Sequence, residues 1–126
     1  MKYSDQQRIQ KIYDYAVDLW KYLAENSITK AQLLTDTPLQ WLVTTPLYNI
    51  GEHVYQLSSD YKDMHPEIPW LMIAGLRHRL VHDYDGTNWN IIADVVFEEL
   101  PALIDNLQHL KEETDESCWT KIRNDC

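Results

Sequence analysis

The chain has 126 residues and a mass of 15.0 kDa, which suits a single domain able to bury about two thirds of its unfolded surface. Its 20 acidic and 11 basic side chains give a formal net charge of −9, which weighs against a passive nucleic-acid binder with a broad basic patch. Only three glycines and five prolines argue against an all-β fold, and no apolar run reaches the roughly eighteen residues of a membrane span.

The first predicted helix runs from about Asp5 to Asn26. Its apolar side chains recur every three to four residues, as on the buried face of an amphipathic helix: Ile9, Ile12, Ala16, Leu19, Trp20 and Leu23. Ser27 and Thr29 can cap a short second helix from Lys30 to about Leu34.

A third helical region is predicted to open at Thr37 as the capping residue, with Pro38 at the first helical position. Its expected buried stripe is Leu39, Leu42, Leu47, Ile50, Val54 and Leu57. Pro46 must either kink this helix or start a new one behind Thr45. Gly51 costs about 1 kcal/mol relative to alanine within a helix, so we expect it to permit a close helix contact.

Pro69 is placed to open a fourth helix from Trp70 to about Tyr84, and Asn88 to cap a fifth with a kink at Pro101. The apolar residues of the fifth helix are Trp89, Ile92, Val95, Val96, Leu100, Leu103, Leu107 and Leu110. From Lys111 onward charged residues dominate. The sequence therefore predicts an all-α, up-and-down bundle of about five helices over residues 1–110, followed by an acidic, flexible tail over residues 111–126.

Cysteine content and the N-terminus indicate the compartment. Cys118 and Cys126 are too few for a disulfide framework, and the segment from Met1 to Asp5 leads into polar-interrupted sequence without the pattern of a signal peptide. We expect a reducing, cytoplasmic setting.

One short run concentrates the chemistry of the chain. Arg77, His78, Arg79, His82 and Tyr84 lie within eight residues of an otherwise acidic protein. Cleavage of a phosphodiester without a metal needs a cation to neutralise the phosphate and a group that moves a proton near neutral pH, and arginine and histidine supply these. The pattern favours phosphodiester chemistry that requires no cofactor.

The geometry of an ideal helix constrains this site. Arg77 and Tyr84 are only about 20° out of line, and His78 and His82 stack one turn apart, whereas Arg77 and His82 point about 140° apart. For Arg77 and His82 to act on one phosphate, the helix must unwind near His82, with residues 83–86 as a suitable place, or a second subunit must supply the missing group.

Several motifs resemble the HepT-like branch of the HEPN superfamily. The central ones are Pro66-Glu67-Ile68-Pro69-Trp70, Ile73-Ala74-Gly75-Leu76-Arg77 and Arg79-Leu80-Val81-His82-Asp83-Tyr84. Upstream, Ile50-Gly51-Glu52-His53 resembles the Ile-Gly-Glu-Ala element of that family, and Glu99-Leu100-Pro101-Ala102-Leu103 resembles its Leu-Pro-x-Leu ending. The resemblance extends from about residue 3 to residue 110. Thr45-Pro46, His53 and His78 depart from the residues that are common in the family.

The resemblance implies a dimeric helical bundle that acts as a metal-independent endoribonuclease, the toxin of a toxin–antitoxin module. It implies that His82 is the acid or base for attack by the RNA 2′-hydroxyl and that Arg77 stabilises the phosphate. His78 would orient His82 or contact the phosphate, with Arg79 as a further basic residue. The implied antitoxin is a small nucleotidyltransferase that can attach AMP to Tyr84.

Other interpretations stay open. The same face could belong to a non-catalytic interaction module that binds a nucleotidyltransferase. His78 and His82 are also spaced as two metal ligands, with Asp83, Asp85 or His53 as further ligands. The four tryptophans on apolar stripes indicate core or dimer contacts rather than a base-stacking surface: Trp20, Trp41, Trp70 and Trp89.

Overall fold

The computed structural model describes residues 3–82 and 87–124, without the side chains of residues 81, 82 and 113–124. All regular secondary structure in these residues is helical, which confirms the predicted all-α class. The elements are α1 (Asp5–Glu25), α2 (Lys30–Thr35), α3 (Thr37–Gln56), α4 (Ser59–Met64), α5 (Trp70–His82), α6 (Trp89–Asp94), the π-helical turn η1 (Val95–Glu99) and α7 (Leu100–Asn124).

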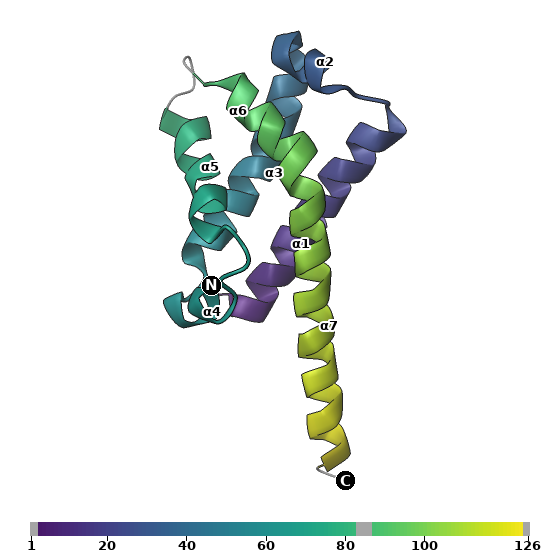
Figure 1. Cartoon of the computed structure of the whole chain (residues 1–126), viewed down its shortest axis with the longest axis vertical. Helices are drawn as coiled ribbons and strands as arrows, with labels where there is room; N and C mark the ends of the chain where they lie inside the picture. The colour runs from purple at the N-terminus through teal and green to yellow at the C-terminus, as the bar shows by residue number, and fades with distance from the viewer. Residues whose placement is uncertain (1–2, 83–86, 125–126) are drawn as a thin grey trace.

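Four long helices form the bundle. Figure 1 shows α1, α3, α5 and α7 running alternately up and down, as the sequence predicted. The α3 helix packs against both α1 and α5, and α7 packs against α1. The short helices α2 and α6 contact each other at one end of the bundle (Figure 1), and α4 connects α3 to α5 at the other. None of the helices in the described ranges is long and apolar enough to cross a membrane.

Side-chain caps determine where several helices begin. Ser4 and Gln7 form a capping box at the start of α1, and Thr29 and Gln32 form another at the start of α2. Asn88 caps α6, as predicted. The α3 cap is Asp36 rather than Thr37, because the Asp36 carboxylate accepts a hydrogen bond from the Leu39 N–H at 3.1 Å.

The third helix excludes one alternative of the sequence interpretation and corrects one expected core residue. It runs unbroken from Thr37 to Gln56 with Pro46 inside it, so no new helix begins behind Thr45. Leu42 was expected in the core but is 38% exposed, and Val43 is fully buried instead. The buried stripe through Leu39, Val43, Leu47, Ile50 and Val54 keeps the three-to-four residue spacing that Leu42 would break.

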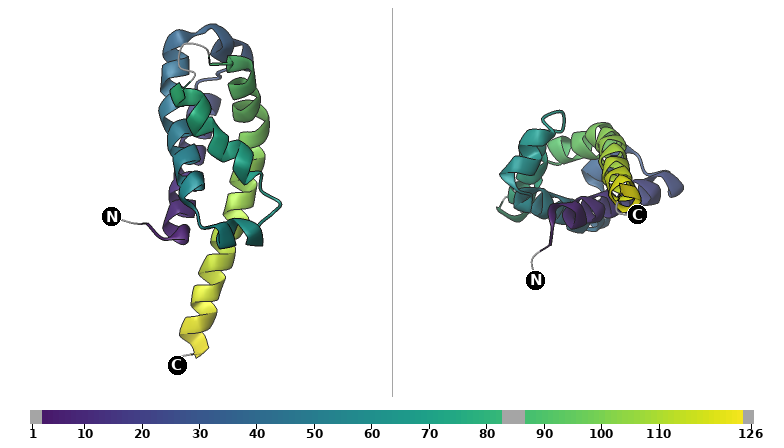
Figure 2. Two further views of the ribbon diagram at one scale, coloured as in Figure 1. Left: turned by 90° about the vertical axis from the view of Figure 1, so that its left-hand side faces the viewer. Right: turned by 90° about the horizontal axis from the view of Figure 1, so that it is seen from below.

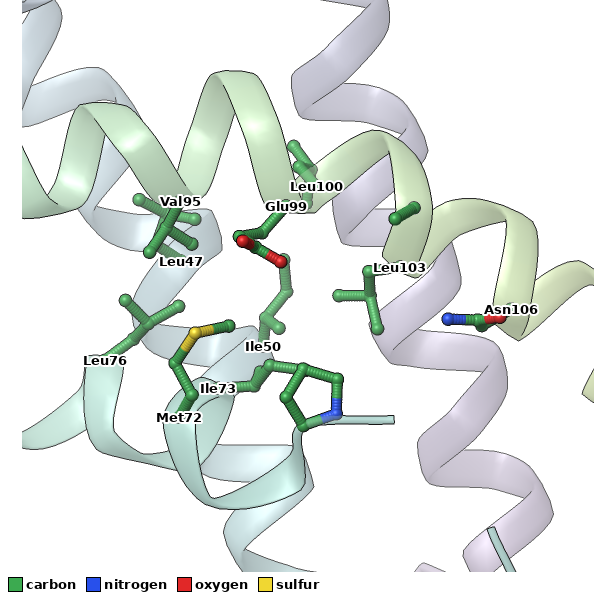
Figure 3. A pocket seen from close by; sticks show the side chains of 12 residues that line it. Leu47, Ile50, Met72, Ile73, Leu76, Val95, Glu99, Leu100, Leu103 and Asn106 are labelled. Atoms are coloured by element: carbon green, nitrogen blue, oxygen red, sulfur yellow. The ribbon is translucent and has the colours of Figure 1, made fainter. Parts of the chain in front are cut away.

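A π-helical turn precedes Pro101, where the sequence predicted a kink. In this turn the Leu100 N–H bonds to the Val95 carbonyl, five residues back. Proline has no N–H and its ring clashes with the carbonyl four residues earlier, so a widened turn accommodates Pro101 without ending the helical path. Beside η1 lies a cavity of about 40 Å³, lined mainly by apolar side chains of α3, α5 and α7, with Glu99 and Asn106 as its polar groups (Figure 3). A cavity of this size has room for a water molecule or two and is too small for a nucleotide.

The last helix reaches further than expected. Its backbone is helical to Asn124, and Figures 1 and 2 show its final turns extending past the rest of the bundle. Residues 111–124 therefore take a helical backbone here, and the division of the chain at residue 110 stays a prediction.

The helices α3 and α5 make a close contact at Gly51. A Cβ atom added there would lie 2.9 Å from the Arg77 backbone nitrogen, 3.1 Å from the Ile73 carbonyl oxygen and 3.2 Å from the Arg77 Cβ. Two of these neighbours are backbone atoms, which cannot move without shifting a helix. The predicted role of Gly51 in a close helix contact is confirmed, and the helix it admits is the one that carries Arg77.

We expect Gly51→Ala to lower the free energy of unfolding by about 1–3 kcal/mol, because the added methyl group must push α5 away from α3. Thr45→Ala is a matched control at an exposed position of the same helix, and should change stability by less than about 0.5 kcal/mol. Urea denaturation followed by circular dichroism measures both. Equal stability of Gly51→Ala and wild type would contradict the close contact.

Candidate active site

Arg77 lies on the flank of α5 that faces α3, and two α3 side chains hold its guanidinium. The Glu52 Oε2 atom is 2.5 Å from the Arg77 Nε atom. The guanidinium carbon also lies 4.4 Å from the centre of the Tyr55 ring, within the range of a cation–π interaction. Because Gly51 lets the two helices approach closely, both contacts are made beside this close contact.

The carboxylate of Glu52 depends on Arg77. Its Oε2 atom is buried and, among the described residues, has no partner in hydrogen-bond geometry, so the ion pair with Arg77 compensates it. The other oxygen accepts a long hydrogen bond of 3.4 Å from the Gln56 amide. A buried carboxylate oxygen without compensation is costly, and the pairing therefore fixes the position of Arg77 relative to α3.

The guanidinium keeps donors for a ligand. The Arg77 side chain is 37% exposed, with Nε toward Glu52 and one face toward Tyr55. A guanidinium carries five N–H donors, so the groups on its two terminal nitrogens remain available to an anion. The geometry of such a fork matches the oxygens of a phosphate or a carboxylate.

The other signature residues occupy the outer side and the end of α5. His78 and Arg79 are exposed. The helix stays regular through His82, so Arg77 and His82 are about 140° apart around the helix and about 7.5 Å apart along it. The helix does not unwind before His82. The His82 side chain and all of Asp83, Tyr84 and Asp85 lie outside the described residues.

His53 lies on the side of α3 that faces α1. Its Nδ1 atom is 3.1 Å from an Arg8 nitrogen, and its ring stacks near Tyr15, with 6.3 Å between ring centres. Within the described ranges, no three His, Cys, Asp or Glu side chains form a group that could hold a metal ion.

The tryptophans divide into two kinds. Trp70 is 7% exposed and belongs to the core, while Trp20 and Trp89 pack against the core from its edge. Trp41 is 61% exposed, so a core role is wrong for this residue. Its interpretation as a dimer contact stays a prediction.

Two residues of this site had no assigned role in the sequence interpretation. Glu52 appeared only within the Ile-Gly-Glu element, and Tyr55 was not singled out. The signal that could have identified them is their spacing from Gly51, because residues one and four positions after a helix-contact glycine flank the contact. The partner helix, and hence Arg77, could not be read from this spacing.

Comparisons with known proteins agree on one family. The model of the family described as "Ribonuclease HepT-like" matches residues 6–110. A Methanocaldococcus jannaschii protein named as a candidate RNase, MJ0127, is 35% identical over 85 residues, which cover 68% of this chain and 70% of that protein. A Thermococcus cleftensis protein named "Probable ribonuclease HepT" is 34% identical over 79 residues, covering 63% of this chain and 72% of that protein. No solved structure gives a significant match.

We expect the stability effects of Arg77 and Glu52 substitutions to be coupled. Arg77→Met should lower the free energy of unfolding by about 1–2 kcal/mol because it leaves the Glu52 carboxylate uncompensated, while Glu52→Gln should cost less than about 1 kcal/mol. The double variant should therefore be more stable than the sum of the two changes implies. A double-mutant cycle in urea measures this coupling, and strictly additive effects would show that the two groups do not interact.

Proposed function

The chain belongs to the ribonuclease HepT-like family of RNA-cleaving hydrolases, and we propose that it is a metal-independent endoribonuclease that cleaves RNA by attack of a 2′-hydroxyl. The observation that carries the proposal is the arrangement at Arg77. Glu52 and Tyr55 orient its guanidinium, which still offers N–H donors to an anion.

In the proposed reaction, Arg77 binds the non-bridging oxygens of the scissile phosphate. The charge on these oxygens rises as the 2′-oxygen attacks, so the guanidinium stabilises the transition state more than the substrate. His82 accepts the proton of the 2′-hydroxyl as the new bond to phosphorus forms. The bond to the 5′-oxygen then breaks, and this oxygen takes a proton from an imidazolium or from water. The products are a 2′,3′-cyclic phosphate and a 5′-hydroxyl.

A second protomer is proposed to complete the site. Since α5 remains helical through His82, Arg77 and His82 of one protomer diverge by about 140°. If the signature residues of two protomers line one cleft, Arg77 of one protomer and His82 of the other can reach the same phosphate.

The outer face of α5 supports a homodimer. Leu71 is 87% exposed, which is unusual for an apolar side chain, and His78 is exposed two turns further along. Between them, a Cβ added to Gly75 would meet no described residue within 4 Å. A glycine within a helix costs about 1 kcal/mol relative to alanine, and no contact within the described residues requires this one. If α5 of a second protomer packed across this position, a glycine would be needed for the two helices to approach closely.

The proposed partner is a small nucleotidyltransferase antitoxin that attaches AMP to Tyr84. Tyr84 follows Arg77 by seven residues in the sequence, and we propose that an adenylyl group there places bulk and negative charge near the phosphate site. The modification would block RNA by occupancy and by repulsion. This makes the chain the toxin of a two-component module, which we expect to act in the cytoplasm.

The alternative function is a non-catalytic module that binds the nucleotidyltransferase through the face from Arg77 to Tyr84. The acidic composition of the chain favours this alternative, because a net charge of −9 repels RNA at long range. A cleavage assay separates the two functions.

We expect the purified protein to cleave mixed single-stranded RNA in EDTA. His82→Ala should abolish cleavage, and Arg77→Ala should lower kcat by about 10²–10³-fold, the range found when one stabilising donor is removed. Gel analysis of labelled RNA measures the rate and shows the cyclic phosphate end. Equal residual cleavage by wild type and His82→Ala would point to a contaminating nuclease and support the non-catalytic alternative.

We expect Leu71→Glu to convert the dimer to a monomer without unfolding it, because the side chain is exposed in the single chain. Met64→Glu is the matched control: Met64 is 71% exposed but lies on α4 rather than on α5. Light scattering after gel filtration gives the mass of each variant. A wild type that is already monomeric, or a dimer that Leu71→Glu leaves intact, would contradict the proposed interface.

A further inference from the structure

A second cluster of basic groups lies where the start of α1 meets the end of α3. The Lys11 Nζ atom is 4.7 Å from the centre of the Tyr3 ring, and the Arg8 guanidinium carbon is 5.6 Å from the same centre. Arg8 also contacts His53 on α3 at 3.1 Å. We call Arg8, Lys11 and His53 the α1–α3 basic cluster.

The Arg8–His53 contact defines the form of the imidazole. Arginine can only donate, so the Nδ1 atom of His53 must accept, and the proton of the neutral ring is then on Nε2. Burial lowers the pKa of His53, the charges of Arg8 and Lys11 lower it further, and Glu52 opposes them. The ring is also edged by Tyr3 and stacked near Tyr15, so its surroundings on the α1 side are aromatic and cationic.

Within the described residues, the cluster has no carboxylate partner. Among the described residues, the basic members of ion pairs are Lys30, His65, Arg77 and His109. Neither Arg8 nor Lys11 takes part in one. Glu52, the nearest acidic residue in sequence to His53, is paired with Arg77. In a chain with 20 acidic side chains, two cations held together beside a neutral histidine form a local positive field.

We propose that Arg8, Lys11 and His53 bind a phosphate group, and that this phosphate belongs to the RNA strand whose scissile phosphate lies at Arg77. Arg8 and Lys11 supply the charge, and the Nε2–H of His53 is available to donate to a phosphate oxygen. The inference rests on the proposed ribonuclease function.

The position of the cluster fits a continuous strand. His53 and Glu52 are consecutive residues on α3, with His53 toward α1 and Glu52 toward Arg77 on α5. The two cationic sites therefore lie on neighbouring flanks of one helix, whose width with side chains is about 10–12 Å. A single strand that crosses the end of α3 would place one phosphate at each flank. The cluster also explains how a protein with a net negative charge could bind RNA. Salt screens the repulsion between the distant acidic groups and RNA, while Arg8 and Lys11 attract a phosphate at short range.

The first arm of the test uses inorganic phosphate. Proton NMR follows the titration of His53 in the full-length protein, in phosphate and in chloride at matched ionic strength. A phosphate bound beside the ring stabilises the imidazolium, so phosphate should raise the pKa of His53, and Arg8→Gln/Lys11→Gln should abolish the difference between the two salts. Identical titrations of the wild type in both salts would overturn the anion site.

The second arm uses RNA in the His82→Ala background, so that binding is measured without cleavage. Arg8→Gln/Lys11→Gln should weaken binding about tenfold and reduce the slope of log affinity against log salt by about 0.7 for each phosphate that the variant no longer neutralises. Lys21→Gln/Lys111→Gln removes the same charge elsewhere and should leave the slope at its starting value. Equal slopes for both double variants would overturn the RNA assignment, and a phosphate effect on His53 with unchanged RNA binding would indicate a site for free phosphate instead.

These outcomes are distinct from those of the cleavage assay. A wild type that cleaves RNA with an unchanged slope in Arg8→Gln/Lys11→Gln retains the proposed function and loses the second phosphate site. A protein that binds RNA through the cluster but does not cleave it retains the site and loses the proposed catalysis.

Discussion

The contact between α3 and α5 at Gly51 is the constraint on which the candidate site depends. With a Cβ at this position, backbone atoms of α5 would lie 2.9 and 3.1 Å away, so only glycine lets the two helices approach this closely. The same contact places the base of the Arg77 side chain within reach of Glu52 and Tyr55. The position of the candidate residue Arg77 on α5 thus depends on the absence of a side chain at Gly51 on α3. The stability of the α3–α5 contact and the position of Arg77 are linked, because a change that separates the two helices also removes Arg77 from Glu52.

The local charge at a site in this chain depends on which basic side chains are paired with carboxylates, as well as on the charge of each region. Residues 87–126 hold nine acidic and three basic side chains, while residues 1–30 hold five basic and four acidic ones. The structure adds that Arg77 is paired whereas Arg8 and Lys11 are not paired with any carboxylate of the described residues. An overall charge of −9 is therefore compatible with a short strip of cationic groups across the end of α3. Such a strip would act only at short range, since salt screens the field of the rest of the molecule beyond about 10 Å.

The fold could be predicted from the sequence where periodicity and capping residues determine it. The apolar spacing of α1 and the Asn88 cap gave correct elements, and Gly51 gave a correct helix contact. Leu42 was misplaced because Leu42 and Val43 are both apolar and only the packing of α3 chooses between them. The π-helical turn could not be foreseen, because proline reports a missing donor but not how the backbone adapts to it. For the candidate site, the motif predicted Arg77. The spacing of Glu52 and Tyr55 from Gly51 marks only the flank of α3 on which they lie, and their contact with Arg77 depends on tertiary packing.

The Glu52–Arg77 pair has a consequence for how the site would meet its substrate. An arginine side chain free in solvent samples many rotamers, and ordering it on binding opposes association by about 0.5–1.5 kcal/mol. Here the carboxylate and the Tyr55 ring order it while the chain folds, so that entropy is already lost before RNA arrives. The Glu52 carboxylate thus preorganises the Arg77 guanidinium for binding a phosphate. The entropy lost by ordering the guanidinium therefore opposes folding and not RNA binding.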